Sequence, residues 1–293
     1  MTTPSAETSA VLDEAFERMA ACGFELPNGF VNHGAMACEA LAALGFETEI
    51  AAWAERFARS AGPEVRAETS SFFEWQDALG NYRRLPEWIG HFEVAIAEDG
   101  WPSVVEVWVP RLLPALATAL FHGAIRTGHA VRAIAATDTE ARREELARAL
   151  GYWAARFRPG QSAGPAAEVD NVRLEIVSAA ANGAHHYLAR PNIFHLHGVT
   201  GAMAVDLLAP HLPANAQAAG LSQVWAEHAA LYDDADKAPV VLTAGLADTE
   251  LATAAEASRD PHQVKLVEAC RRGFELTGDP VFTAAAGMVT GLS

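Results

Sequence analysis

Lysine is nearly absent from this sequence: of its 21 basic residues only Lys237 and Lys265 are lysine, and the rest are arginine. Burial can remove the proton from a lysine amine, whereas arginine keeps its charge. Lys265 stands three residues after His262, so we interpret it as an amine retained for its chemistry. A neutral amine can be carboxylated by carbon dioxide, which converts it into an anionic oxygen ligand. The structural alternative is an ordinary helical salt bridge with Glu268.

Positive charge as a whole is scarce, and the formal net charge is −16. Nucleic-acid binding needs clustered Lys and Arg, so this balance argues against a nucleic-acid partner, and also against an anionic membrane surface. Cysteine is rare too, since Cys22, Cys38 and Cys270 are the three present. Their odd number and the lack of CxxC spacing predict reduced, mostly buried thiols in a cytoplasmic protein. A catalytic cysteine is the alternative interpretation.

A long hydrophobic run is also missing. The most apolar stretch, residues 104–125, contains Arg111, two prolines and His122. It therefore does not predict a transmembrane helix, and we expect no membrane partner. The N-terminal segment is acidic and polar, so no secretory signal is predicted.

Several catalytic and cofactor motifs do not occur. No GxGxxG follows a predicted strand, no GxxxxGK[ST] is present, and HExxH and GxSxG are both missing. The sequence therefore predicts no nucleotide-binding or flavin-binding residues.

The composition that remains is typical of a helical protein. Ala, Leu, Glu and Arg are frequent and are strong helix formers. Helices are predicted over 9–22, 33–44, 50–61, 86–97, 103–109, 139–157, 174–189, 199–208, 221–232, 250–257 and 262–276, with 111–135 forming one long helix or two. Residues 62–86 read as a structured loop, and the one candidate strand is 240–243. A C-terminal Gly45 and an N-cap Thr139 mark two of the helix ends, with Arg142, Arg143, Glu144 and Glu145 expected on an outer face.

The chain length allows one large domain or two modest ones, and 51% hydrophobic residues provide ample core material. We interpret residues 1–293 as a single all-α domain, a helical bundle with a buried metal site. The turn-rich composition of 158–170 makes that segment a candidate internal linker.

Two histidines seven residues apart, His122 and His129, would lie within about 20° of one helix face, with Cα atoms about 10.5 Å apart. They can just hold one ion between them, whereas the structural alternative is two core histidines bonded to backbone carbonyls. Arg126 lies one turn from each on the same face. It is the predicted catalytic residue, at a pocket wall, pairing a carboxylate or a substrate phenolate.

Four further histidines stand near predicted helix starts. His33 has Asn32 before it and Gly34 after it, and a cap or core residue is the alternative to a ligand. His195 and His197 would face the same side if the segment before 199 is extended. His262 follows a proline that opens a helix and precedes Lys265 by about one turn.

Six blocks of the sequence together resemble the questin oxidase-like family. They are residues 32–41 (NHGAMACEAL), 111–114 (RLLP), 121–132 (FHGAIRTGHAVR), 145–155 (ELARALGYWAA), 197–201 (HGVTG) and 262–270 (HQVKLVEAC). The blocks occur in the expected order, and the resemblance spans residues 28 to 285, nearly the whole chain. The resemblance implies oxidative ring opening of polycyclic aromatic polyketides such as anthraquinones, with molecular oxygen as the second substrate.

The resemblance also implies a mononuclear non-haem Fe(II) centre with several histidine ligands and a carboxylated lysine. Carried over by motif, the ligands are His33, His122, His129, His197 and carboxylated Lys265. His262 is the alternative to His197, or a partner that holds the lysine carbamate. Four imidazoles and one anionic oxygen suit Fe(II) and leave one position open.

Two other functions remain open at this stage. One is a Baeyer–Villiger-type monooxygenase that uses NADPH without a tightly bound metal. The other is a helical protein that binds an aromatic metabolite without converting it.

Overall fold

The computed structural model describes residues 6–63, 74–164, 169–232 and 248–292. Within these ranges every regular element is helical, with two isolated β-bridges, so the all-α prediction is confirmed. The elements are α1 (Ala6–Ala20), α2 (Gly34–Leu44), α3 (Glu47–Ser60), α4 (Trp75–Ala78), η1 (Tyr82–Arg84), α5 (Leu85–Asp99), α6 (Trp101–Leu112), η2 (Leu113–Ala115), α7 (His122–Ala136), α8 (Glu140–Ala155), α9 (Val172–Ala189), α10 (Ile193–Leu208), η3 (Ala209–His211), α11 (Ala214–Leu231), α12 (Asp248–Ser258), α13 (Pro261–Thr277) and α14 (Pro280–Thr290). The candidate strand 240–243 and part of the candidate linker lie outside the described residues.

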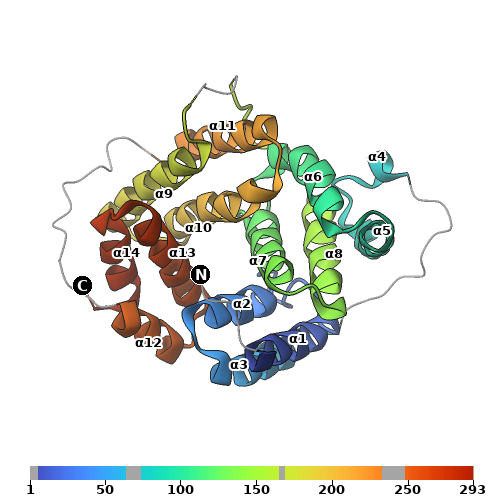
Figure 1. Cartoon of the computed structure of the whole chain (residues 1–293), viewed down its shortest axis with the longest axis horizontal. Helices are drawn as coiled ribbons and strands as arrows, with labels where there is room; N and C mark the ends of the chain where they lie inside the picture. Colours follow the sequence, from blue (N-terminus) through green and yellow to red (C-terminus); the bar gives the residue numbers. More distant parts are fainter. Residues whose placement is uncertain (1–5, 64–73, 165–168, 233–247, 293) are drawn as a thin grey trace.

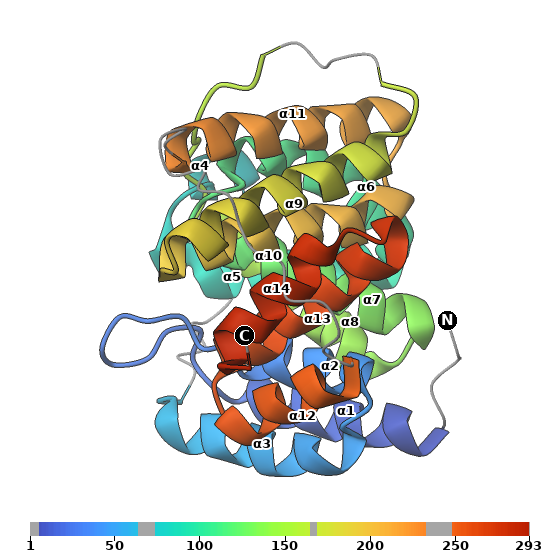
Figure 2. The same cartoon turned by 90° about the vertical axis from the view of Figure 1, so that its left-hand side faces the viewer.

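Four helices from distant parts of the sequence meet in the middle of the molecule: α2, α7, α10 and α13 (Figure 1). Helices α1 and α3 pack at one end of this group and α11 lies at the other, as both views show (Figure 2). Helix α8 packs between α7 and α5, α9 packs along α10, and α12 and α14 flank α13. Among the described residues, no helix has both the length and the apolar character needed to cross a membrane.

The segment 111–135, predicted to form one long helix or two, is divided between two helices. Helix α6 ends at Leu112, and residues 116–121 form a turn before α7 begins at His122. Prolines at 110 and 114 remove backbone donors there, which weakens a continuous helix. The backbone of Ala119, Leu120 and Phe121 has positive φ. Such a conformation costs an L-residue on the order of 1–2 kcal/mol.

Helix α10 begins six residues earlier than predicted. The side chain of Asn192 accepts a hydrogen bond from the backbone N–H of His195, which caps the helix at Ile193. The segment is therefore helical where an extended form was expected. In a helix residues i and i+2 point to different sides, so His195 and His197 do not share a face.

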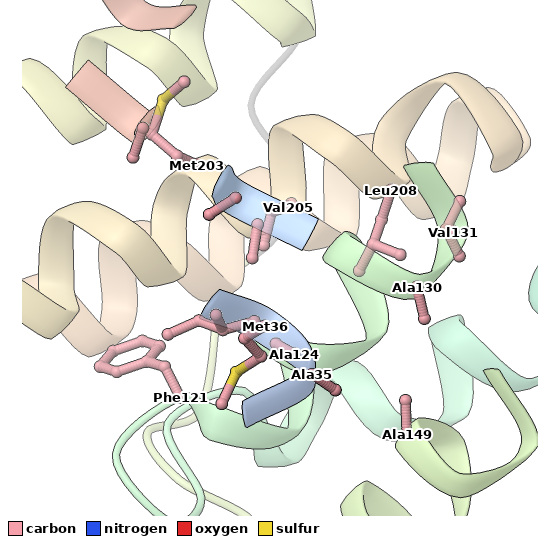
Figure 3. Packing of buried hydrophobic residues seen from close by; sticks show 14 of the residues in the cluster. Ala35, Met36, Phe121, Ala124, Ala130, Val131, Ala149, Met203, Val205 and Leu208 are labelled. Carbon is pink, nitrogen blue, oxygen red and sulfur yellow. The ribbon is translucent and has the colours of Figure 1, made fainter. Parts of the chain in front are cut away.

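Close packing at the start of α7 depends on two glycines. A Cβ on Gly123 would lie 2.7 Å from the ring of Trp153, and a Cβ on Gly201 would overlap the ring of Phe121. Phe121, Ala124 and Met36 lie among the buried side chains where α7 meets α2 and α10 (Figure 3). Burial of one such large side chain contributes about 1.5–3 kcal/mol. The glycines of the HG and HGVTG blocks thus serve helix packing.

Two helix-end predictions are confirmed, and one surface prediction is wrong for half of its residues. Gly45 ends α2 in the left-handed conformation, and the Thr139 side chain accepts from the backbone of Arg142. Arg143 is exposed and Glu144 is half-buried, but Arg142 and Glu145 are buried instead of lying on an outer face. Both are paired with opposite charges, Arg142 with Asp13 and Glu145 with Arg126, which is how charged groups tolerate burial.

Candidate metal centre

Four histidines meet where the starts of the central helices converge. Each of His33, His122, His197 and His262 offers a ring nitrogen, and these nitrogens all lie within 4.8 Å of one another. The Nε2 atom of His122 lies 2.7 Å from Nε2 of His33 and 3.2 Å from Nε2 of His197. The ring of His262 meets the rings of His33 and His197 edge-on at 4.5 and 5.2 Å. Such a set of imidazoles fits a single transition-metal ion.

Backbone carbonyls fix the protonation of two of these rings. Nδ1 of His122 lies 2.5 Å from the carbonyl oxygen of Ala119, and Nδ1 of His197 lies 2.7 Å from that of Ile193. A carbonyl can only accept, so each Nδ1 carries the proton. In the neutral ring the inward-facing Nε2 is then an unprotonated lone pair, the form that binds metal.

His33 is held at the start of α2 by its two neighbours. The Asn32 side chain accepts from the backbone of Gly34 and donates to the carbonyl of Gly23. A Cβ on Gly34 would overlap the sulfur of Met19, so only glycine allows α1 to pack this closely. The Asn-His-Gly motif is therefore the local framework that directs His33 into the group.

His262 is held by the residue that caps its helix. The Oδ1 atom of Asp260 accepts from the backbone N–H of His262 at 2.9 Å and lies 3.2 Å from the ring Nδ1 of the same residue. A carboxylate on the outer nitrogen is a common partner of metal-binding histidines. Asp260 was missed from the sequence, although an Asp before a helix-opening proline is a recognisable N-cap.

The surroundings keep all four rings neutral. Burial, with a contribution from Lys265, lowers the pKa of His122 from 6.5 to about 3. The same causes hold the pKa values of His33 and His197 well below the ordinary value, and burial lowers that of His262. Three of the histidines also stand at the N-terminal end of a helix, whose positive dipole disfavours an imidazolium and favours an anion.

Lys265 is buried beside this group. The residue is 1% exposed, and its Nζ atom has no hydrogen-bond partner among the described residues. The predicted alternative, a salt bridge with Glu268, does not form, because Glu268 binds Arg132 and Arg272 instead. Burial lowers the pKa of Lys265 to about 7. The amine is therefore neutral in a large fraction of molecules near neutral pH.

The structure differs from the predicted ligand set at His129. This residue is not part of the four-histidine group, and its Nδ1 lies 2.5 Å from the carboxylate of Glu39. His122 opens α7 where the four helix starts meet, whereas His129 lies two turns deeper. His262, the predicted alternative, is in the group. Ligation by His129 through its other nitrogen stays a prediction.

A chain of alternating charges runs behind the site. Glu39 binds Arg132, Arg132 binds Glu268, and Glu268 binds Arg272 at 2.6 Å. The chain continues from Arg272 to Asp206 at 2.9 Å and from Asp206 to Arg173 at 2.6 Å. It therefore ties together α2, α7, α13, α10 and α9, a set that includes every helix of the four-histidine group.

Arg126 pairs a carboxylate, as predicted, and this carboxylate belongs to Glu145 on the neighbouring helix α8. Its guanidinium makes a two-point contact with Glu145 at 2.6 and 2.7 Å and lies over the ring of Phe24 at 4.4 Å. The predicted carboxylate partner is present, but the pair is buried between α7 and α8. These contacts give Arg126 a role in packing and lend no support to the predicted catalytic role.

The remaining candidates are structural. His195 points its Nδ1 at the carbonyl of His186 and its ring at Tyr232, away from His197. All three cysteines are free and buried, and burial raises the pKa of Cys38 to about 12. A thiol with such a pKa is a poor nucleophile, so the catalytic-cysteine alternative finds no support at Cys38.

Comparison with protein-family models and with curated proteins finds no match for this chain. The likeness to the questin oxidase-like family therefore rests on the sequence blocks alone.

Proposed function

We propose that the four-histidine group holds one Fe(II) ion and that the protein is an oxygen-dependent oxidoreductase acting on a polycyclic aromatic substrate. The observation that carries the proposal is the pair of facing lone pairs on His122 and His197, 3.2 Å apart. Two unprotonated nitrogens repel each other at this distance unless a cation lies between them. The sequence blocks shared with an oxygenase family support the choice of chemistry.

The choice of metal follows from the ligands and from the resemblance. Imidazole binds zinc, copper, iron and nickel, so the ring nitrogens alone do not select among them. An oxygenase needs a redox-active ion, and the resemblance favours Fe(II). When bound, such an ion would supply the redox chemistry that lets molecular oxygen react with an organic substrate. The four histidines would hold the ion through their ring nitrogens, and their burial keeps the rings neutral.

Lys265 is proposed as the anionic ligand after carboxylation. Its amine nitrogen attacks the carbon of carbon dioxide, an N–C bond forms, and one proton leaves to water or a neighbouring base. The helix starts around the site favour the resulting negative charge, and a bound cation would neutralise it. Among the described residues Nζ has no hydrogen-bond partner, so no hydrogen bond would have to break when a carboxyl group forms on it.

The substrate is proposed to approach from the side of His262, whose side chain is 25% exposed while the other three histidines are buried. Phe30 and Phe194, each three residues before a histidine of the group, are 67% and 56% exposed. Aromatic side chains of this kind would suit a planar aromatic ligand.

Metal analysis and oxygen uptake test this function together. Protein purified without chelators should contain about one iron per chain by elemental mass spectrometry, and should consume oxygen when given a hydroxylated anthraquinone. His122→Ala should lose both, while His185→Ala, a change at an exposed histidine, should keep both. Metal-free protein that oxidises NADPH with the substrate would support a Baeyer–Villiger-type enzyme instead. Substrate binding without oxygen uptake would support a binding protein.

A further inference from the structure

The strained backbone positions of this protein gather beside the four-histidine group. In the described part of the chain, four residues other than glycine have positive φ: Ala119, Leu120, Phe121 and Arg259. The first three directly precede His122, and the fourth lies three residues before His262. Strain of this kind persists only where surrounding structure enforces it, and it concentrates at functional sites.

The three consecutive left-handed residues act on His122 through a carbonyl. Their φ values are 48°, 56° and 64°. The reversal they produce turns the carbonyl of Ala119 toward the ring that follows, where it accepts from Nδ1 of His122 at 2.5 Å. The same carbonyl accepts from the backbone N–H of His122 at 3.3 Å. One oxygen thus fixes both the start of α7 and the orientation of the ring.

Contacts on both sides hold this turn in place. The hydroxyl of Thr118 donates to the carbonyl of Arg158 and accepts from its N–H. The indole of Trp153 donates to the carbonyl of Ala115 at 3.1 Å. The ring of Phe121 fills the space that Gly201 leaves open on α10. The strain is therefore sustained by packing that is independent of any bound ion.

Glycine would adopt these φ values without strain, yet Ala, Leu and Phe stand there. A side chain restricts the backbone, so it makes the turn more rigid than glycine would. We propose that the left-handed turn 119–121 is a positioning element that fixes the ring orientation and tautomer of His122 before a metal ion binds. The proposal rests on the proposed metal site, and its effect on the ring can be measured without metal.

The test is Ala119→Gly, compared with Ala117→Gly in the same turn, where φ is not positive. Glycine at 119 relieves strain, so the melting temperature of the metal-free variant should stay equal or rise. The ring of His122 should lose its single Nδ1–H form, seen as exchange broadening or a mixed tautomer in ¹⁵N-histidine NMR of the metal-free protein. Metal affinity, measured by chelator competition, should fall about tenfold. Ala117→Gly should lower the melting temperature and leave the tautomer unchanged.

The outcomes separate the positioning role of the turn 119–121 from the proposed metal-dependent function. If Ala119→Gly keeps the wild-type tautomer signal, the positioning role is wrong whatever the metal result. If its stability falls as in Ala117→Gly while the tautomer is retained, the turn is merely structural. A wild type that binds no metal, with the tautomer change present in Ala119→Gly, would overturn the proposed function and retain the positioning role.

Discussion

The Nε2 atoms of His122 and His197 lie 3.2 Å apart, and neither carries a proton in the neutral rings. This follows from the outer nitrogens, each of which donates to a backbone carbonyl, that of Ala119 or that of Ile193. The arrangement is unfavourable for the protein alone and favourable around a cation. Residues that hold the outer nitrogens should therefore control metal affinity without touching the metal.

The Asp260 carboxylate offers a direct measure of this control. Asp260→Asn keeps an N-cap but removes the charge beside Nδ1 of His262, so metal affinity should fall about 10–100-fold. Asp279→Asn is the matched control, because Asp279 also precedes a proline and caps α14 at 2.9 Å without contacting a histidine. Chelator competition on both variants checks the prediction. Equal affinities would show that Asp260 serves only as a cap.

The ligand set is tested by His262→Ala and His129→Ala. We expect His262→Ala to lose most of the metal, because His262 belongs to the four-nitrogen group. His129→Ala should mainly lower stability, since it removes one of the two partners of the buried Glu39 carboxylate and leaves only Arg132. Iron content and urea unfolding of both variants provide the measurement. Loss of iron in His129→Ala with unchanged stability would restore His129 as a ligand.

We expect metal binding to require the Lys265 amine nitrogen, which can be carboxylated, and not the positive charge of the side chain. Lys265→Arg keeps a positive charge but cannot form the carbamate, so iron and oxygen uptake should be lost together. Lys265→Ala should recover part of both when acetate or propionate is added, because a carboxylate can take the vacated oxygen position. ¹³C NMR with labelled bicarbonate should show a carbamate signal in wild type and none in Lys265→Arg. A signal present in both would contradict the assignment.

Stability of the metal-free protein should fall as pH decreases from 6.5 to 5. The folded pKa values of His122 and His228 are about 3 and 4, and those of His33 and His197 are also well below 6.5. In this window the unfolded chain binds protons that the folded chain does not, so acid favours unfolding. Each such histidine contributes about 1.4 kcal/mol per pH unit at most. Urea unfolding at pH 7, 6 and 5 checks this, and His122→Gln should reduce the slope.

Arg126 should matter for stability and not for metal binding. Arg126→Met leaves the buried carboxylate of Glu145 without its partner, which costs about 3–5 kcal/mol of unfolding free energy. The double variant Arg126→Met/Glu145→Leu should recover much of this loss, because both charges are then gone. Denaturant titration measures the stability, and iron content should stay near wild type. A large drop in oxygen uptake in the stable double variant would return Arg126 to a substrate role.

The sequence was sufficient to predict an all-helical protein and several helix ends, and to single out Lys265. Helix formers, the Thr139 N-cap and the Gly45 stop are local signals, and the structure confirms them. The scarcity of lysine pointed to an amine that is indeed buried without a hydrogen-bond partner. Such features depend on residues that are close in the chain, so the sequence alone could predict them.

The membership of the histidine group was decided by tertiary structure. Spacing put His122 and His129 on one helix face, but it could not show that His33, His197 and His262 gather around the first of the two. No local propensity predicts three successive left-handed residues at 119–121. Packing of Phe121 on Gly201 and of Trp153 on Gly123 enforces that turn. These contacts join residues far apart in sequence, and their combined energy overrides local preference.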